Sequence, residues 1–301
     1  MQTTTTTTAT QASVLAEQLT RASRKQFWDV YSYFQWPDTL PSDAWLMSPE
    51  LISIYGTETW ERLGEEQRIK LSLYEIANFF SLTLQGERPL VGGMSDLLYS
   101  SKLSPQATEY MHHFIDEENK HMIMFGIFCR KYLGKVYPEK KILLPRDYAK
   151  GEAEITFFCK VLVVEELGDY YNVLMQRDKR IHPLVQELNF VHHRDEARHL
   201  GFGRELTKEL WEKHVQSWSP EVITRFRTWL TQYVKSSWGD FYNPSMYRDA
   251  GLTRDNGIGD PYEIRQAALT HPRCIEHREK ASKKLITYFL RNGMLTEAPS
   301  L

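Results

Sequence analysis

The sequence predicts an all-α fold built around long helices. Four long stretches carry helical patterns of apolar and polar residues, from about Thr59 to Gly86, Ser104 to Leu133, Glu152 to Gln176 and Pro183 to His214. No stretch shows the alternation of apolar and polar residues that is typical of a half-buried strand. A chain of 301 residues, 42% of them hydrophobic, can bury a substantial core.

Shorter elements flank these four stretches. Residues 1–12 are rich in Thr, Gln and Ala and predict a disordered tail, because such residues bury little apolar surface. One helical domain is expected over residues 13–295, with its core helices at about 59–214. The other expected elements are a helix from Ser13 to about Phe34, a short helix near Ser48 to Tyr55, a kinked continuation of the first core helix past Pro89, and helices at Pro220 to Trp238 and Arg273 to Arg291.

Charge and hydropathy argue against several classes of protein. The net charge of −2 provides no field that would attract nucleic acid or acidic lipid. The most apolar run, Ile155 to Val164, is too short to span a membrane, and no signal-peptide pattern stands at the N-terminus. Three cysteines cannot all pair, and their apolar neighbours predict buried, reduced thiols in a cytoplasmic protein: Cys129, Cys159 and Cys274.

Two Glu-x-x-His pairs stand on separate predicted helices, Glu118–His121 and Glu196–His199. Residues three apart on a helix lie about 60° apart, so each pair shares a face. A single pair arises readily on a solvated helix. Two facing pairs are what a ferritin-like di-metal site requires, together with one Glu from each of two further helices. The long connection from Gly134 to Ala149 is typical of the crossover in such a bundle.

The spacing of the acidic residues predicts the two remaining Glu ligands. Glu87 precedes Glu118 by the same number of residues as Glu165 precedes Glu196. The two halves of the core therefore repeat with a constant offset in residue number, which equals the separation of Glu87 and Glu165 in the sequence. Glu165 follows four apolar residues, and a buried carboxylate requires a cation or a metal as partner. Glu75 is the alternative to Glu87, and Glu166 is the alternative to Glu165.

Other polar residues surround the predicted ligands. His192 lies four residues before Glu196 and shares its helix face, whereas His193 points about 100° away. Glu117 and Asp195 immediately precede the two metal glutamates and are separated by the same repeat offset. We expect each to accept the outer ring N–H of a ligand histidine from the other half, with a salt bridge to Lys120 or Arg194 as the alternative.

The ligand types indicate the metal. Four carboxylates with two or three imidazoles and no thiolate suit iron or manganese better than structural zinc. Two divalent ions would balance the charge of the four carboxylates, so the centre can be buried nearly neutral. Such a pair of metals could bind O₂ between them. The residues alone therefore predict an O₂-active di-metal carboxylate protein.

The segment from His192 to His199, HHRDEARH, resembles the fourth core helix of the p-aminobenzoate N-oxygenases, non-haem di-iron enzymes that convert arylamines to nitro compounds. Those enzymes carry an extra histidine four residues before the last metal glutamate, the position that His192 occupies. The similarity extends over roughly Glu75 to Phe202. It implies a ferritin-like four-helix core with seven metal ligands: Glu87, Glu118, His121, Glu165, His192, Glu196 and His199.

The resemblance also implies a function. We expect a di-iron monooxygenase with two Fe ions that N-oxygenates a small amine in secondary metabolism, using O₂ and electrons from a donor protein or a small reductant. A di-iron C–H hydroxylase or desaturase and a non-catalytic iron-binding protein stay open as alternatives. Nucleic acid and membrane are not expected as partners, and the chain could form a homodimer.

Asp169 lies four residues after Glu165, one turn along the same face, and is expected to look into the cavity beside the metals. As we read the family, the aminobenzoate enzymes carry an amide there. An ionised Asp169 only accepts hydrogen bonds and would repel a carboxylate, which predicts an amine substrate other than p-aminobenzoate. Pairing of Asp169 with a neighbouring Arg or Lys is the alternative.

Overall fold

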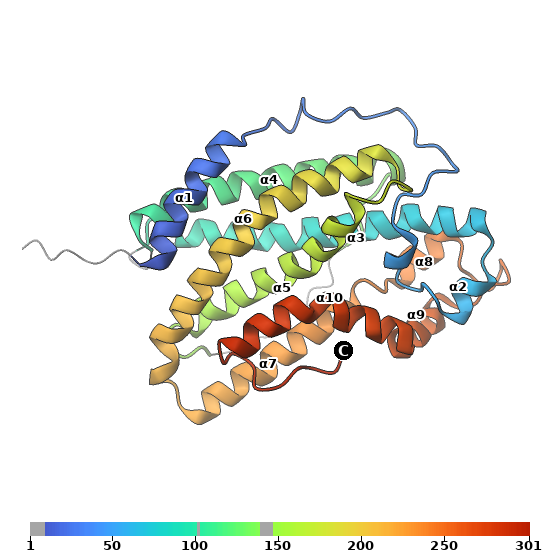
Figure 1. Cartoon of the computed structure of the whole chain (residues 1–301). Helices are drawn as coiled ribbons and strands as arrows, with labels where there is room; N and C mark the ends of the chain where they lie inside the picture. The colour runs from blue at the N-terminus through green and yellow to red at the C-terminus, as the bar shows by residue number, and fades with distance from the viewer. Residues whose placement is uncertain (1–9, 101–102, 139–146) are drawn as a thin grey trace, which may run out of the picture.

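A computed structural model describes residues 10–100, 103–138 and 147–301. These residues form ten α-helices and two 3₁₀ helices (Figure 1). Within the same ranges the only extended pairing is an isolated bridge between Trp45 and Ile181, which confirms the all-α prediction.

Four long helices make the core: α3 (Glu65–Leu97), α4 (Pro105–Leu133), α5 (Glu152–Met175) and α6 (Pro183–His214). Helix α3 packs along α4 and α5 packs along α6, while contacts of α3 with α5 and of α4 with α6 join the two pairs. Residues 134–151 connect α4 to α5, and of these 139–146 lie outside the described ranges. Two helix pairs joined by one long connection form the predicted ferritin-like bundle.

The core repeats in structure as well as in sequence. Helices α4 and α6 both begin at a proline, and Pro105 and Pro183 are separated by the repeat offset. The first helices of the two pairs approach closely at Gly86 and Val164, which are separated by the same offset. A Cβ atom on Gly86 would lie 2.7 Å from Val164 Cγ1, so only glycine permits this contact one residue before Glu87.

The first helix differs from the prediction at both ends. Helix α1 (Gln11–Lys25) begins two residues before Ser13, because the Thr10 side chain caps it by accepting the Ser13 N–H. The predicted tail therefore ends before Gln11, and its residues 1–9 lie outside the described part of the chain. Helix α1 ends well before Phe34, because the Asp29 carboxylate accepts hydrogen bonds from Tyr31 N–H and Ser32 Oγ and so favours a turn.

The elements from η1 to the end of α3 also differ from the predicted bounds. A short helix α2 (Glu58–Arg62) precedes α3, and the expected helix near Ser48 is a single 3₁₀ turn, η1 (Pro49–Leu51). Helix α3 starts at Glu65 and passes through Pro89 to Leu97. Its last two turns are held by the buried Leu90 and Met94. Their packing offsets the loss of the backbone hydrogen bond that the proline cannot donate.

The C-terminal third wraps one side of the core. It comprises η2 (Val215–Ser217), α7 (Pro220–Gly239), α8 (Pro244–Ala250), α9 (Pro261–Thr270) and α10 (Pro272–Arg291). Helices α7 and α10 pack on α5, α8 packs on α3, and α1 packs on α4 and α6 on the other side (Figure 1). Helices α8 and α9 were not predicted, because they are too short for a periodic pattern, although Asn243–Pro244 and Asp260–Pro261 are typical capped starts.

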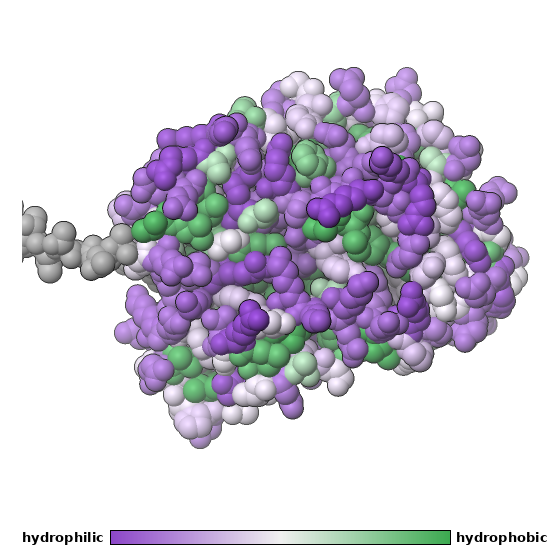
Figure 2. Space-filling view, in the orientation of Figure 1, coloured by the Kyte–Doolittle hydropathy of each residue, from purple (hydrophilic) through white to green (hydrophobic). Residues whose placement is uncertain are grey.

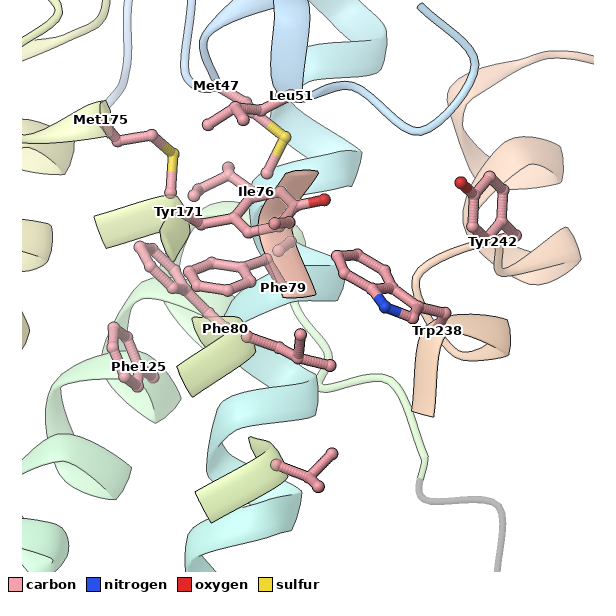
Figure 3. Close-up of a cluster of buried hydrophobic side chains, with 14 of the residues drawn as sticks. Met47, Leu51, Ile76, Phe79, Phe80, Phe125, Tyr171, Met175, Trp238 and Tyr242 are labelled. Atoms are coloured by element: carbon pink, nitrogen blue, oxygen red, sulfur yellow. The ribbon is translucent and has the colours of Figure 1, made fainter. Parts of the chain in front are cut away.

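The largest apolar cluster joins these added helices to one end of the bundle. Its centre is formed by Phe79 and Phe80 of α3, which stack on Tyr171 at 5.2 Å and on Phe125 at 4.4 Å between ring centroids. Figure 3 shows these rings together with Met175 at the end of α5, and with Met47 and Trp238 from two other parts of the chain. A second cluster at the other end of the bundle contains Tyr110, Phe114, Phe158 and Phe202.

The surface gives no sign of a membrane-spanning element. No helix within the described ranges is long and apolar enough to cross a bilayer. The face in Figure 2 is mainly hydrophilic, with small and separate apolar patches.

Glu75 lies in the apolar cluster and binds the segment that precedes α2. Its carboxyl accepts hydrogen bonds from the Ser53 backbone N–H at 3.1 Å and from Ser53 Oγ, which also lies 2.7 Å from Tyr247 Oη. Only 4% of the residue is exposed, and burial raises the pKa of Glu75 to about 8. The side chain therefore binds Ser53 as a neutral acid at neutral pH.

This burial predicts a dependence of stability on pH. Between its unfolded pKa of 4.5 and its folded pKa of about 8, Glu75 holds a proton in the folded chain that the unfolded chain has released. The free energy of unfolding should therefore fall as the pH rises through this window. Glu75→Gln should lack this contribution, so its stability relative to wild type should improve by a few kcal/mol from pH 5 to pH 9 in urea denaturation. Glu66→Gln, at an exposed position on α3, is the control, and parallel curves for Glu75→Gln and wild type would contradict the assignment.

Candidate metal centre

The seven predicted ligands all come from the four core helices and all point inward. Helix α3 supplies one, α4 two, α5 one and α6 three, and none is more than 2% exposed: Glu87, Glu118, His121, Glu165, His192, Glu196 and His199. Residues that are far apart in sequence thus meet in the middle of the bundle.

Six of the seven form two overlapping groups of converging ligand atoms. Within each group the atoms lie within 4.8 Å of one another, and the groups share His121 and Glu196. Glu87 and His192 complete the first group, and Glu118 and His199 complete the second. Each group could hold one metal ion.

Glu196 stands at the centre of the cluster. Its Oε1 atom lies 3.1 Å from His192 Nε2, 3.3 Å from His199 Nδ1 and 3.4 Å from His121 Nδ1. Ligand atoms that share an ion through bonds of about 2.1 Å lie about 3 Å apart. The spacing of these atoms therefore suits ligation of a common ion.

Glu165 lies beside the two groups. Burial raises its pKa, and the nearby carboxylates of Glu196 and Glu118 raise it further, so the side chain faces the same cluster. Its alternative, Glu166, instead pairs with Arg204 and with Lys284 at 3.8 Å. Glu75, the alternative to Glu87, binds Ser53. The structure thus places Glu87 and Glu165 at the cluster, and Glu75 and Glu166 elsewhere.

Unpaired polar atoms indicate what the cluster lacks. Most of the converging atoms are buried without a hydrogen-bond partner among the described residues: both oxygens of Glu87 and of Glu118, Glu165 Oε1, Glu196 Oε2, His121 Nδ1 and His192 Nε2. Buried polar groups are costly unless they are paired, so a set of this kind requires cations. Burial also raises the pKa of Glu87 to about 7, which shows that its charged form lacks a sufficient partner. The donor set fits two divalent metal ions.

The outer nitrogens of two ligand histidines are each held by a carboxylate. His121 Nε2 of α4 lies 3.4 Å from Asp195 Oδ2 of α6, and His199 Nε2 of α6 lies 2.8 Å from Glu117 Oε2 of α4. A carboxylate in this position fixes the ring orientation and leaves Nδ1 free for the metal. Each carboxylate thus comes from the other half of the repeat.

Arg198 connects these two carboxylates. Its Nη2 atom donates to Glu117 Oε1 at 2.6 Å and to Asp195 Oδ1 at 2.8 Å. Ser23 and Gln26, at the end of α1, accept from the same guanidinium. Arg194 also donates to Asp195, which is the salt bridge considered as the alternative. Spacing along one helix could not predict this role of Arg198, because its contacts join α6 to residues of α1 that are far away in sequence.

His192 is oriented by a different partner. The Asn172 side-chain amide lies 2.6 Å from His192 Nδ1, so Nε2 faces Glu87 and Glu196. Asn172 follows Glu165 by two turns along one face of α5, and this spacing could have identified it. The adjacent His193 points away from the cluster and binds Asp169.

Apolar rings border the cluster on both sides. The Phe114 ring stacks on His199 at 3.8 Å between centroids, and the Phe125 ring meets His192 edge-on at 5.0 Å. Phe114 and His192 are separated by the repeat offset, so the repeat places a phenyl ring where the other half has its third histidine. The two halves therefore offer unequal ligand sets.

Asp169 lies outside this cluster. Its Oδ1 atom is 2.5 Å from His193 Nδ1, and the residue lines a cavity of about 700 Å³ between α5, α6 and α10. None of the seven predicted ligands lines that cavity, whose charged residues are Glu166, Asp169, Arg204, Lys280, Lys283, Lys284 and Arg291. The Asp169 carboxylate thus contacts a histidine rather than the Arg or Lys considered as the alternative, and the cavity beside it is not bordered by the predicted metal ligands.

Comparison with known proteins agrees with this geometry. The family described as P-aminobenzoate N-oxygenase AurF matches residues 9–292. Uncharacterized proteins of Mycobacterium bovis and Mycobacterium tuberculosis are 26% identical over 191 residues, which cover 59% of this chain and 52% of each relative. The chain thus spans about half the length of these curated relatives. By its match over most of its length, the chain belongs to the p-aminobenzoate N-oxygenase family of ferritin-like di-iron oxygenases.

Proposed function

We propose that this chain is an O₂-dependent monooxygenase that uses two iron ions to oxidise the nitrogen of a small amine, giving a hydroxylamine, nitroso or nitro product. The family match supports an oxygenase. The finer assignment to nitrogen oxidation rests on His192, whose Nε2 atom joins Glu87 and Glu196 in a seven-residue ligand set.

The chain's own residues supply the binding and orientation. Glu87 and His192 would help to hold one ion and Glu118 and His199 the other, while His121 and Glu196 belong to both groups and Glu165 lies beside them. When bound, iron would supply O₂ activation and the change of oxidation state. Carboxylate and imidazole ligands without thiolate suit iron in this role.

The surrounding residues keep the ligands in place and exclude water. Asp195 and Glu117 hold the His121 and His199 rings from behind, and Asn172 holds the His192 ring. The Phe114 and Phe125 rings cover two of the imidazoles with apolar surface. A dry site strengthens the electrostatic interactions within it and limits side reactions with water.

The direct test is metal analysis followed by product analysis. We expect about two irons per chain after aerobic or reconstituted purification, because six of the seven buried ligands converge in two groups and most of their converging atoms have no hydrogen-bond partner. With O₂ and a reductant, the loaded protein should convert members of a panel of aryl and alkyl amines, with and without a carboxylate, to N-oxygenated products detected by mass spectrometry. Products oxidised only at carbon would favour the hydroxylase alternative, and active protein without iron would refute the proposal.

His192→Ala should separate metal binding from nitrogen oxidation. The variant keeps four carboxylates and two imidazoles, which suffice for two irons, so iron content should stay near wild type. The yield of N-oxygenated product should fall at least tenfold or shift to another product. His193→Ala, one residue away and outside the cluster, is the matched control and should keep both iron and product. Full activity of His192→Ala would make His192 a bystander.

Glu117→Gln should weaken metal binding without removing a ligand. The amide cannot carry the charge that supports the His199 ring and pairs with Arg198, and loss of such an outer partner typically lowers metal affinity about 10–100-fold. The measurement is competition for Fe²⁺ with a coloured chelator. Asp116→Asn removes the neighbouring, half-exposed carboxylate, which binds Lys120, and should leave the affinity unchanged. Equal affinities for Glu117→Gln and wild type would exclude this role.

A further inference from the structure

The buried metal ligands raise the question of how electrons reach them. A monooxygenase that takes electrons from an external donor needs a path through the protein, and no ligand residue is more than 2% exposed. Electron tunnelling is faster along covalent and hydrogen bonds than across gaps between atoms. Fast reduction of this buried centre therefore requires a continuous bonded route from the surface to one of the ligands.

Trp28 provides such a route. Its indole N–H donates to Asp195 Oδ2 at 2.9 Å, and the same oxygen lies 3.4 Å from His121 Nε2. His121 offers its other ring nitrogen, Nδ1, to both groups of metal ligands. Three side chains thus link an indole ring outside the bundle to the centre of the cluster.

The outer side of Trp28 is covered by aromatic rings that reach solvent. Trp28 itself is 5% exposed and meets Tyr33 and Phe34 edge-on, at 5.5 and 5.7 Å between ring centroids. The neighbouring Phe27 and Tyr31 are 68% and 77% exposed. This segment follows α1 in the long connection that passes over α4 and α6 (Figure 1). An electron donor can therefore approach within a few residues of the indole.

The other half of the repeat has no equivalent route among the described residues. There, Glu117 holds His199 and is bound by Arg198, whose further partners are the polar side chains of Ser23 and Gln26. No aromatic ring in the described ranges extends that branch from Arg198 toward the surface. The aromatic exit is thus specific to the Asp195–His121 branch.

We propose that Trp28 is the entry point for electrons, which pass from an external donor through Asp195 and His121 to the metal centre. The inference rests on the proposed di-iron function. Each transfer oxidises the donor by one electron and reduces one Fe³⁺ to Fe²⁺, and Trp28 itself stays neutral. Trp28 is a positioning residue in this scheme, because it acts through Asp195 and touches neither substrate nor metal.

The test injects electrons at a chosen site. The three native cysteines are buried, so a ruthenium photoreductant can be attached selectively to an introduced cysteine. In iron-loaded protein, Tyr31→Cys places the label beside the proposed entry point. Leu174→Cys places it on α5, at a 42% exposed position about 13 Å along the axis from Glu165, where the path does not include Trp28. The measurement is the rate of Fe³⁺ reduction after a laser flash, with ascorbate as the sacrificial donor and without any amine.

We expect Trp28→Phe to slow injection from position 31 at least tenfold and to change injection from position 174 less than twofold. Iron content and reduction potential should stay at the values of the labelled parent proteins. Trp28→His, which retains a ring N–H for Asp195, should recover most of the rate from position 31.

Three results would overturn the inference: equal rates with and without Trp28, equal slowing from both positions, or loss of iron from Trp28→Phe, which would make the residue structural. If Trp28→Phe binds iron and its iron is reduced from position 31 at the parent rate, this inference is refuted but the proposed function is not. A wild-type chain that binds no iron refutes the proposed function and this route with it.

Discussion

The structure depends on the burial of four carboxylates and three imidazoles in the middle of a helical bundle. Taking charged groups out of water costs several kcal/mol per group unless opposite charges replace the water. Protons can do so only in part, as the raised pKa values of Glu87 and Glu165 indicate. Two divalent ions neutralise the carboxylates completely. The bundle therefore holds a buried negative charge that bound metal ions would balance.

The added helices serve this requirement in different ways. Helix α1 and its C-terminal cap bring Ser23 and Gln26 to Arg198, which holds the carboxylates behind His121 and His199, so this part of the N-terminal segment supports the metal centre. The C-terminal helices instead close the α5 side, where Arg204 and Lys284 neutralise Glu166. A bare four-helix bundle would leave both sides of the site more open to water.

The sequence predicted best what helical geometry determines locally. The two Glu-x-x-His pairs and the constant repeat offset depend only on spacing along a helix, and the structure brings Glu87, Glu118, Glu165 and Glu196 to one place. What it could not predict depends on contacts across long sequence separations. Asp29 ends α1 locally, but Trp28 meets Asp195 from a distant part of the chain. Glu75 of α3 meets Ser53, which in turn meets Tyr247 of α8. Asp169 of α5 meets His193 of α6, a contact that its spacing from Glu165 along one helix could not indicate.

The departure from symmetry matters most for chemistry. A perfect repeat would give two equivalent metal sites, each with the same neighbours. Here Phe114 stands at the position that corresponds to His192, so one group of ligands gains an imidazole and the other gains a stacked phenyl ring. The aromatic exit through Trp28 also belongs to only one half. Two ions held in these unequal surroundings would receive different ligands and have different neighbours, which would allow them to take different parts in one reaction.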